Sequence, residues 1–233
     1  IGCEMDKEKN RLWKKIIHNA TTKAEPGVLF WDTILRESPA DCYSDFGFKT
    51  ISTNPCGEIP LAAGDACRLM SLNLYSYVDY PFTSDARFNF DKFINHAKLS
   101  IKLMDNMIDL ENEKIDKILA KIDADPEDDD IKAVEKSLWL RVKRMNNFGR
   151  RSGIGFTALG DMLAALGFKY GTPEATNFVA YVQKIMATAV YIGSCDLVQV
   201  DGRPAFGCFD YELEKNNPFL NRLTMPSEFS WDY

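Results

Sequence analysis

The chain has 233 residues, of which 45% are hydrophobic and 27% charged, as expected for a globular protein with a sizeable core. Its formal net charge of -6 gives no large basic surface, so we expect no nucleic-acid partner. We see no apolar run long enough for a membrane span and no signal peptide, and the start at Ile1 suggests a segment of something longer.

Cysteine usage indicates a reducing, cytoplasmic setting, because the cysteines are too few and too scattered for a secreted disulfide scaffold. They form no C-x-x-C pair and no pair of histidines accompanies them, so we expect no zinc or other metal site. The six are Cys3, Cys42, Cys56, Cys67, Cys195 and Cys208.

The first fifty residues predict one helix followed by turns. Residues 5–20 have a helical pattern with Leu12, Ile16 and Ile17 on one side, and Pro26-Gly27 ends that region. The apolar run 28–31 predicts a buried strand or the start of a helix. Residues 38–47 are rich in turn formers, and residues 48–53 can extend into the loop that follows.

The stretch 53–58, Thr-Asn-Pro-Cys-Gly-Glu, is the first candidate site. Asn54, Cys56 and Glu58 occupy alternate positions, so an extended backbone would present an amide, a thiol and a carboxylate on one side. Such a set can bind a polyol and carry out proton and sulfur chemistry on it.

The neighbours of Cys56 bear on both its backbone and its ionisation. Pro55 biases Asn54 toward an extended conformation, and Gly57 permits a tight bend or the close approach of a ligand. The Glu58 anion opposes loss of the thiol proton, and an intact S–H suits hydrogen-atom transfer better than hydrolysis, which uses a thiolate. The alternative is a structural cysteine buried in a turn.

The middle of the chain predicts a strand and a long helix. Met70, Leu72 and Leu74 alternate with polar residues, so residues 66–74 should form a strand. Asn89 or Asp91 can cap the helix that follows, whose apolar residues have helical spacing. Those residues are Phe93, Ile94, Ala97, Ile101, Met104 and Ile108.

Residues 123–130 hold six carboxylates and one proline. A calcium loop needs Gly at its sixth position and Glu at its twelfth, but counting from Asp123 these positions hold Asp128 and Val134. We therefore expect a solvated connector between two helices. The apolar positions of the second helix are Ile131, Val134, Leu138, Val142 and Met145.

Residues 149–155, Gly-Arg-Arg-Ser-Gly-Ile-Gly, are the second candidate site. Glycines and arginines before a helix can bind phosphate, but the Lys-Ser/Thr ending of a phosphate-binding loop is missing. A tight helix start with exposed arginines is the preferred interpretation, and this helix should run to Leu166 and stop at Gly167. Residues 172–174, Thr-Pro-Glu, predict the start of another helix that residues 201–204 break, before an irregular tail. The apolar positions of that helix are Phe178, Val182, Ile185, Ala189 and Ile192.

Two stretches, Ser52–Leu61 and Asp65–Leu74, resemble the catalytic subunit of ribonucleotide reductases. The Asn-Pro-Cys-Gly-Glu spelling looks most like the adenosylcobalamin-dependent class II ribonucleoside-diphosphate reductases, although the sequence does not distinguish a diphosphate from a triphosphate substrate. Residues 24–27, 39–43 and 149–166 are similar to the same family, so the resemblance covers essentially the whole chain. It implies an α/β fold, in which residues 1–233 are the helix-rich central part of a ten-stranded barrel with the radical cysteine on an inner loop.

The resemblance also implies roles for individual residues. Cys56 would carry a thiyl radical that takes the 3′ hydrogen of the ribonucleotide. Glu58 would be the base at the 3′ hydroxyl, and Asn54 would bind the sugar hydroxyls. Cys67 would be half of a dithiol that supplies two electrons. The substrate-binding loop would comprise Thr53, Asn54, Pro55, Gly57 and Glu58.

Parts of the family pattern have no counterpart in this sequence, among them the partner cysteine of Cys67 and the later phosphate-binding loop. We therefore expect an incomplete, inactive piece that works with the remaining segments of a reductase, with adenosylcobalamin bound mainly outside this stretch, and with a thioredoxin-like reductant. Three alternatives remain open. They are a class I reductase with a separate radical-generating subunit, a cysteine hydrolase using His18 or His96, and a non-catalytic scaffold.

Overall fold

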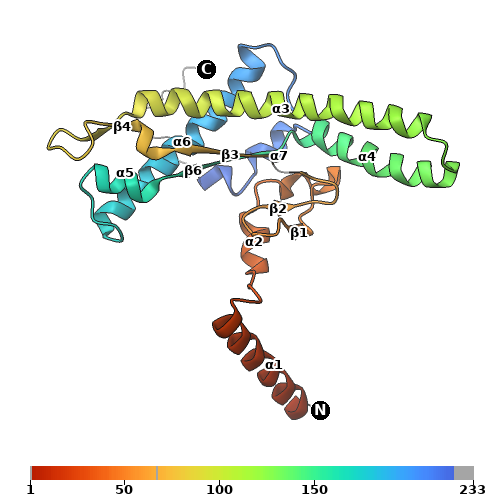
Figure 1. Ribbon diagram of the computed structural model, residues 1–233, viewed down its shortest axis with the longest axis horizontal. Helices are drawn as coiled ribbons and strands as arrows, with labels where there is room; N and C mark the ends of the chain where they lie inside the picture. Colours follow the sequence, from red (N-terminus) through yellow and green to blue (C-terminus); the bar gives the residue numbers. More distant parts are fainter. Residues whose placement is uncertain (1, 67, 223–233) are drawn as a thin grey trace.

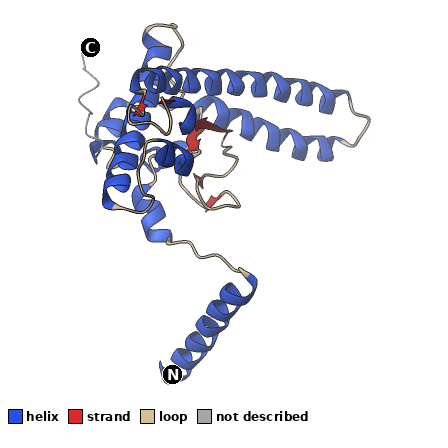
Figure 2. Ribbon diagram, turned by 60° about the vertical axis from the view of Figure 1, so that its left-hand side comes forward, coloured by secondary structure: helices blue, strands red, loops and turns tan. Residues whose placement is uncertain are grey.

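The computed structural model describes residues 2–66 and 68–222, with side chains from Asp6 onward. Helices dominate, and the strands are short (Figure 2). The helices are α1 (Gly2–Lys23), α2 (Trp31–Glu37), α3 (Phe90–Ala124), α4 (Asp129–Gly149), α5 (Leu159–Ala165), α6 (Pro173–Gln199) and α7 (Tyr211–Lys215). The strands are β1 (Ser52–Thr53), β2 (Pro60–Leu61), β3 (Arg68–Asn73), β4 (Val78–Asp79), β5 (Arg87–Phe88) and β6 (Ser152–Thr157). Three 3-10 turns are η1 (Asp41–Phe46), η2 (Leu74–Tyr77) and η3 (Leu220–Arg222).

The main core lies where α3 crosses α6, and both helices begin at the caps that the sequence predicts. The Asn89 side chain accepts a hydrogen bond from the Lys92 N–H, and the Thr172 hydroxyl accepts one from the Ala175 N–H. Gly193 lets the two helix backbones approach closely, because an added Cβ there would lie 2.9 Å from the Lys98 Cα. The largest fully buried side chains of this core include Phe93, Leu74, Met162, Ile185 and Val182.

Strands β3 and β6 form a parallel pair, with Arg68 opposite Ser152 and Asn73 opposite Thr157. The strand predicted around residues 66–74 is thus confirmed, but the second candidate site does not start a helix. Its glycines lead into β6, and a helix begins only at Leu159, after Ala158 takes a left-handed conformation (φ 59). No closed barrel is present among residues 2–66 and 68–222, where each sheet has two strands.

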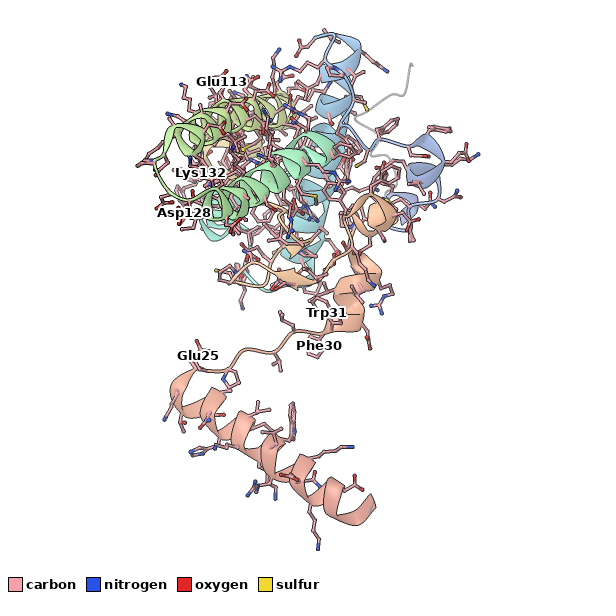
Figure 3. All side chains as sticks on the ribbon, turned by 90° about the vertical axis from the view of Figure 1, so that its right-hand side faces the viewer. Glu25, Phe30, Trp31, Glu113, Asp128 and Lys132 are labelled. Carbon is pink, nitrogen blue, oxygen red and sulfur yellow. The ribbon has the colours of Figure 1, made fainter. Side chains whose placement is uncertain are left out.

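Helix α1 projects away from the body of the molecule, and residues 24–30 link it to α2 (Figures 1 and 3). The apolar run before α2 does start a helix at Trp31, but it is not buried: Phe30 is 78% exposed and Val28 is 64% exposed. Burial was expected from composition alone, and little of the described chain covers this segment. Leu29 is also 52% exposed, although its Cδ2 lies 3.1 Å from the position of a Cβ built on Gly57.

Helices α3 and α4 extend together as a long hairpin whose acidic tip is a connector, as predicted (Figure 1). An ion pair between Lys136 and Asp123 joins α4 to α3 near this tip, and one between Lys132 and Asp129 lies within α4. Figure 3 labels Asp128 and Lys132 at the tip. The apolar face predicted for α4 is buried at the inner end of the helix, at Met145. At the outer end the same face is uncovered, at Ile131, Val134 and Leu138.

Helix α6 is long and apolar enough to cross a membrane by length and composition, contrary to the expectation that no segment is. Such a property is weak evidence for a span, since the core helix of a globular protein shares it. Nine residues of α6 are buried, among them Val182, Ile185 and Ala189, which lie in the core beside α3. Packing in the core accounts for the apolar composition of α6.

Candidate functional site

Cys56 lies in a loop that closes the hairpin of β1 and β2. The strands pair antiparallel, with Ser52 opposite Leu61. Inside the loop, the Asn54 N–H donates to the Ile59 carbonyl (3.1 Å) and the Gly57 N–H donates to the Asn54 carbonyl (3.0 Å). The extended backbone expected for residues 53–58 is therefore wrong, because the chain makes a tight turn from Asn54 to Gly57.

The turn has a clear cause in the sequence. Pro55 stands at the second position of the turn, where its fixed φ is favourable, and Gly57 closes it with a φ of 81°. The Asn54 side chain reinforces the loop, because its Oδ1 accepts a hydrogen bond from the Ile59 N–H (3.0 Å). The Thr53 hydroxyl donates to the Asn54 carbonyl (2.9 Å).

The loop presents its reactive groups to the outside. Pro55, Cys56 and Glu58 are exposed, and the Cys56 thiol is free. The alternative of a buried structural cysteine is therefore wrong for this structure. Asn54 is half-buried, and its Oδ1 is engaged within the loop, which leaves its amide N–H groups to face a ligand.

Glu58 borders a pocket of about 600 Å³, within the usual range for a small-molecule site. The pocket brings the two candidate sites together, since residues 149–154 form another part of its wall. The segment before the hairpin, helix α6 and the region of α7 complete it. Side chains from these parts include Tyr43, Phe48, Tyr191, Phe206 and Glu214.

Arg150 and Arg151 border the pocket, but they are neither exposed nor free for phosphate. Arg150 pairs with Asp105 and Asp109, and Arg151 pairs with Asp65, whose side chain is 2% exposed. Burial opposes the charged form of Arg150, but the hydrogen bonds to the two aspartates outweigh it and raise the pKa of the guanidinium. The expectation of exposed arginines is corrected: they neutralise buried carboxylates.

Cys67 lies outside the described residues, so only its neighbours can be placed. Asp65 is held by Arg151. Arg68 pairs with Glu111 and donates hydrogen bonds to the Asn146 Oδ1 (2.6 Å) and the Arg151 carbonyl (3.1 Å). Helices α3 and α4 thus hold the start of β3 firmly.

A cluster of phenol and thiol groups along the pocket wall was missed by sequence reasoning. The Tyr43 hydroxyl donates to Glu214 Oε1 (2.7 Å), and the Cys208 thiol donates to the Phe148 carbonyl (3.0 Å). Burial, followed by the hydrogen bond to Glu214, raises the pKa of Tyr43 well above its ordinary value. Burial also raises the pKa of the Cys42 thiol to about 11 and that of Tyr191 to about 12. These groups stay protonated at neutral pH.

Comparison with known proteins agrees with the motif. Residues 4–225 match the family described as ribonucleotide reductase, barrel domain. The chain is 26% identical over 211 residues to a vitamin B12-dependent ribonucleoside-diphosphate reductase of Mycobacterium tuberculosis (strain ATCC 25618 / H37Rv), covering 90% of this chain and 25% of that protein. A protein of the same name from Thermoplasma acidophilum is 28% identical over 204 residues, which are 87% of this chain and 22% of that protein.

A vitamin B12-dependent ribonucleotide reductase of Streptomyces clavuligerus is 25% identical over 194 residues, 82% of this chain and 17% of that protein. The chain thus spans about a quarter or less of the length of these relatives. The family match extends over nearly all of the chain and includes both motif-bearing stretches. The chain therefore belongs to the family of ribonucleotide reductase barrel domains.

Proposed function

We propose that residues 1–233 are the central part of the barrel domain of a vitamin B12-dependent reductase that converts ribonucleotides to deoxyribonucleotides. The observation that carries the proposal is the Asn54–Glu58 turn, which exposes a thiol beside a carboxylate that borders a pocket of about 600 Å³. The names of the relatives support reduction of a ribonucleoside diphosphate in particular. The rest of the barrel would come from other segments of the same reductase.

In the proposed mechanism, Cys56 as a thiyl radical takes the 3′ hydrogen atom of the ribose. The Glu58 carboxylate accepts the proton of the 3′ hydroxyl, and the Asn54 amide donates to the sugar hydroxyls. The dithiol that includes Cys67 supplies two electrons and two protons and becomes a disulfide: one proton leaves with the 2′ hydroxyl as water, and the other is bound at C2′. Glu58 returns its proton to the 3′ oxygen, and the hydrogen atom returns from Cys56 to C3′, so the thiyl radical is regenerated.

The radical on Cys56 requires a group that removes its hydrogen atom, and the printed names of the relatives point to cobalamin. The exposed thiol is accessible to such a group, but Cys56 borders neither the pocket that Glu58 lines nor the pockets beside Cys195 and Arg144. None of these three pockets therefore joins Cys56 to a site for a corrin. We propose that adenosylcobalamin, which would supply the hydrogen-abstracting radical, is held mainly by other parts of the reductase.

The remaining partners follow from the same chemistry. Each turnover oxidises the dithiol of Cys67, so a thioredoxin-like protein would have to reduce it again. A cytoplasmic setting would keep these thiols reduced. A class I reductase with a separate radical-generating subunit is the alternative within the family, and the B12-dependent relatives favour class II.

A cysteine hydrolase finds little support in the geometry. Such an enzyme needs a histidine beside Cys56. His96 packs against the Tyr77 ring and its Nδ1 lies 3.2 Å from the Tyr77 hydroxyl. His18 belongs to α1, which projects away from the body (Figure 1). Neither histidine borders the pocket that Glu58 lines.

The direct test is Cys56→Ser in the complete reductase. The serine O–H bond is too strong to replace the thiol, so deoxynucleotide formation should be abolished while nucleotide binding stays nearly intact. Cys195→Ser is the matched control, since Cys195 is also an exposed thiol but lies on α6. Turnover would be followed by chromatography of deoxynucleotides, and binding by calorimetry. Retained turnover in Cys56→Ser would rule out the thiyl mechanism.

A further inference from the structure

The orientation of the Cys56 hairpin depends on the segment before it, because β1 and β2 have only two residues each. That segment, residues 38–50, is folded tightly on itself. The Asp41 carboxylate accepts hydrogen bonds from the Thr50 N–H (2.8 Å) and the Thr50 hydroxyl (2.7 Å), and the Ser38 hydroxyl lies 3.3 Å from that of Thr50. These hydrogen bonds tie the two ends of residues 38–50 into one unit directly before β1.

Two contacts fix this unit from outside. On one side Phe48 is buried against Gly149, so closely that a Cβ on Gly149 would lie 2.5 Å from its ring. On the other side the Tyr43 hydroxyl donates to Glu214 Oε1 (2.7 Å) and accepts from the Asp210 N–H (3.4 Å). These partners lie at the end of α4 and in the region of α7.

The contact of Tyr43 with the α7 region is the more specific of the two, because it depends on a buried hydrogen bond. Tyr43 is 5% exposed and its ring meets Phe206 edge to face, with ring centroids 5.6 Å apart. A buried hydroxyl that donates to a carboxylate makes a strong hydrogen bond, and its loss leaves the carboxylate without that donor. Asn217, which is buried, supports the same contact by donating to the Pro39 carbonyl (3.0 Å).

Tyr43 and Glu214 also border the pocket that Glu58 lines. The hydrogen bond between them thus joins the wall formed by the α7 region to the unit that carries the Cys56 hairpin. We propose that Tyr43 and Glu214 are positioning residues that set the Cys56 loop over this pocket, an inference that rests on the proposed function of Cys56 and Glu58. They act through the backbone of residues 38–50 and do not touch the reacting atoms.

The test compares Tyr43→Phe, Glu214→Ala and the double variant in the complete reductase. Tyr43→Phe keeps the ring and its contact with Phe206, so only the two hydrogen bonds of the hydroxyl, to Glu214 and from the Asp210 N–H, are lost. We expect kcat to fall about tenfold to a hundredfold, as for a displacement of about 1 Å in a reacting group, with KM changed less than about twofold. The control is Tyr211→Phe, which removes an exposed hydroxyl from α7 itself.

Two further measurements separate positioning from general stability. Release of tritium from the 3′ position reports the Cys56 step and should fall with kcat. Amide hydrogen exchange should accelerate about tenfold in residues 38–61 and remain unchanged in α3 and α6. The effects of the two single variants should not add in the double variant, because both remove the hydrogen bond between Tyr43 and Glu214.

Unchanged exchange in residues 38–61, or equal acceleration throughout the protein, would overturn the positioning role. So would normal kcat and normal tritium release in Tyr43→Phe. The exchange measurement needs no turnover, so it decides this inference even if the unmodified protein forms no deoxynucleotide. Failure of the unmodified protein to form deoxynucleotide would instead count against the proposed function.

Discussion

Gly193 provides the sharpest test of how the scaffold is packed. A Cβ built there would lie 2.9 Å from the Lys98 Cα, 3.0 Å from the Lys98 carbonyl oxygen and 2.8 Å from the Ile101 Cγ2. Two of these three atoms belong to the α3 backbone and cannot rotate away, so Gly193→Ala must push α3 and α6 apart. Such overpacking costs about 1–3 kcal/mol.

The intrinsic helix propensity acts in the opposite direction. Replacing Gly by Ala inside a helix stabilises it by about 1 kcal/mol. The expected net effect of Gly193→Ala is a loss of up to about 2 kcal/mol in the free energy of unfolding. Gly160→Ala is the control, because Gly160 is an exposed helical residue of α5 with no atom within 4 Å of its built Cβ.

Urea unfolding of the complete protein would measure both variants, with hydrogen exchange in α6 as a local readout. Gly160→Ala should be as stable as the parent protein or up to about 1 kcal/mol more stable. If Gly193→Ala were as stabilising as Gly160→Ala, the close approach of α3 and α6 would be wrong.

Three other predictions can be checked independently. Cys67→Ala should still release 3′ tritium but not complete sugar reduction, and normal repeated turnover would refute its role in the dithiol. Burial raises the pKa values of Cys42 and Cys208 to about 11, from an ordinary value of 9.0. The unfolded state therefore binds fewer protons between these values, so thermal stability should fall as pH rises from about 9 to about 11, and less so in Cys42→Ala. The isolated 233-residue chain should self-associate and form no deoxynucleotide with adenosylcobalamin and a dithiol, as centrifugation and chromatography would show; turnover by its monomer would contradict this.

The sequence predicted the helices well because their signals are local. Asn89 and Thr172 are caps within three residues of the N–H groups that they bind, and both were confirmed. The start of β6 was mistaken for a helix, since Gly-rich stretches fit several backbone shapes and only the pairing with β3 decides between them. Asn54 and Gly57 favour a turn, whereas the alternating side chains of residues 54–58 favour an extended backbone, and the structure has the turn.

The candidate site was only partly predictable because its parts are distant in sequence. Local residues identified Cys56 and Glu58, but nothing near Tyr43 indicates that its hydroxyl binds Glu214, 171 positions further on. The arginines at 150 and 151 illustrate the same limit. Their charge suggested a phosphate site, whereas their function in the fold depends on Asp65 and Asp105, which only the tertiary structure brings near.

The exposed surfaces of the scaffold connect the missing sheet to the proposed chemistry. Parallel strands are normally buried on both faces, yet alternate residues of β3 are exposed, and Leu69 is 62% exposed. The described part of the chain thus covers one face of β3, through Leu72 and the core beside α3, and leaves the other open. In the proposed complete reductase, additional strands beside β3 and β6 would satisfy their free edges, and closure of the barrel would enclose the open face. The radical chemistry proposed at Cys56 would need the same enclosure, because an exposed thiyl radical would react with other molecules before it met its substrate. Under the proposed function, the addition of further barrel strands would therefore both complete the sheet and protect the radical.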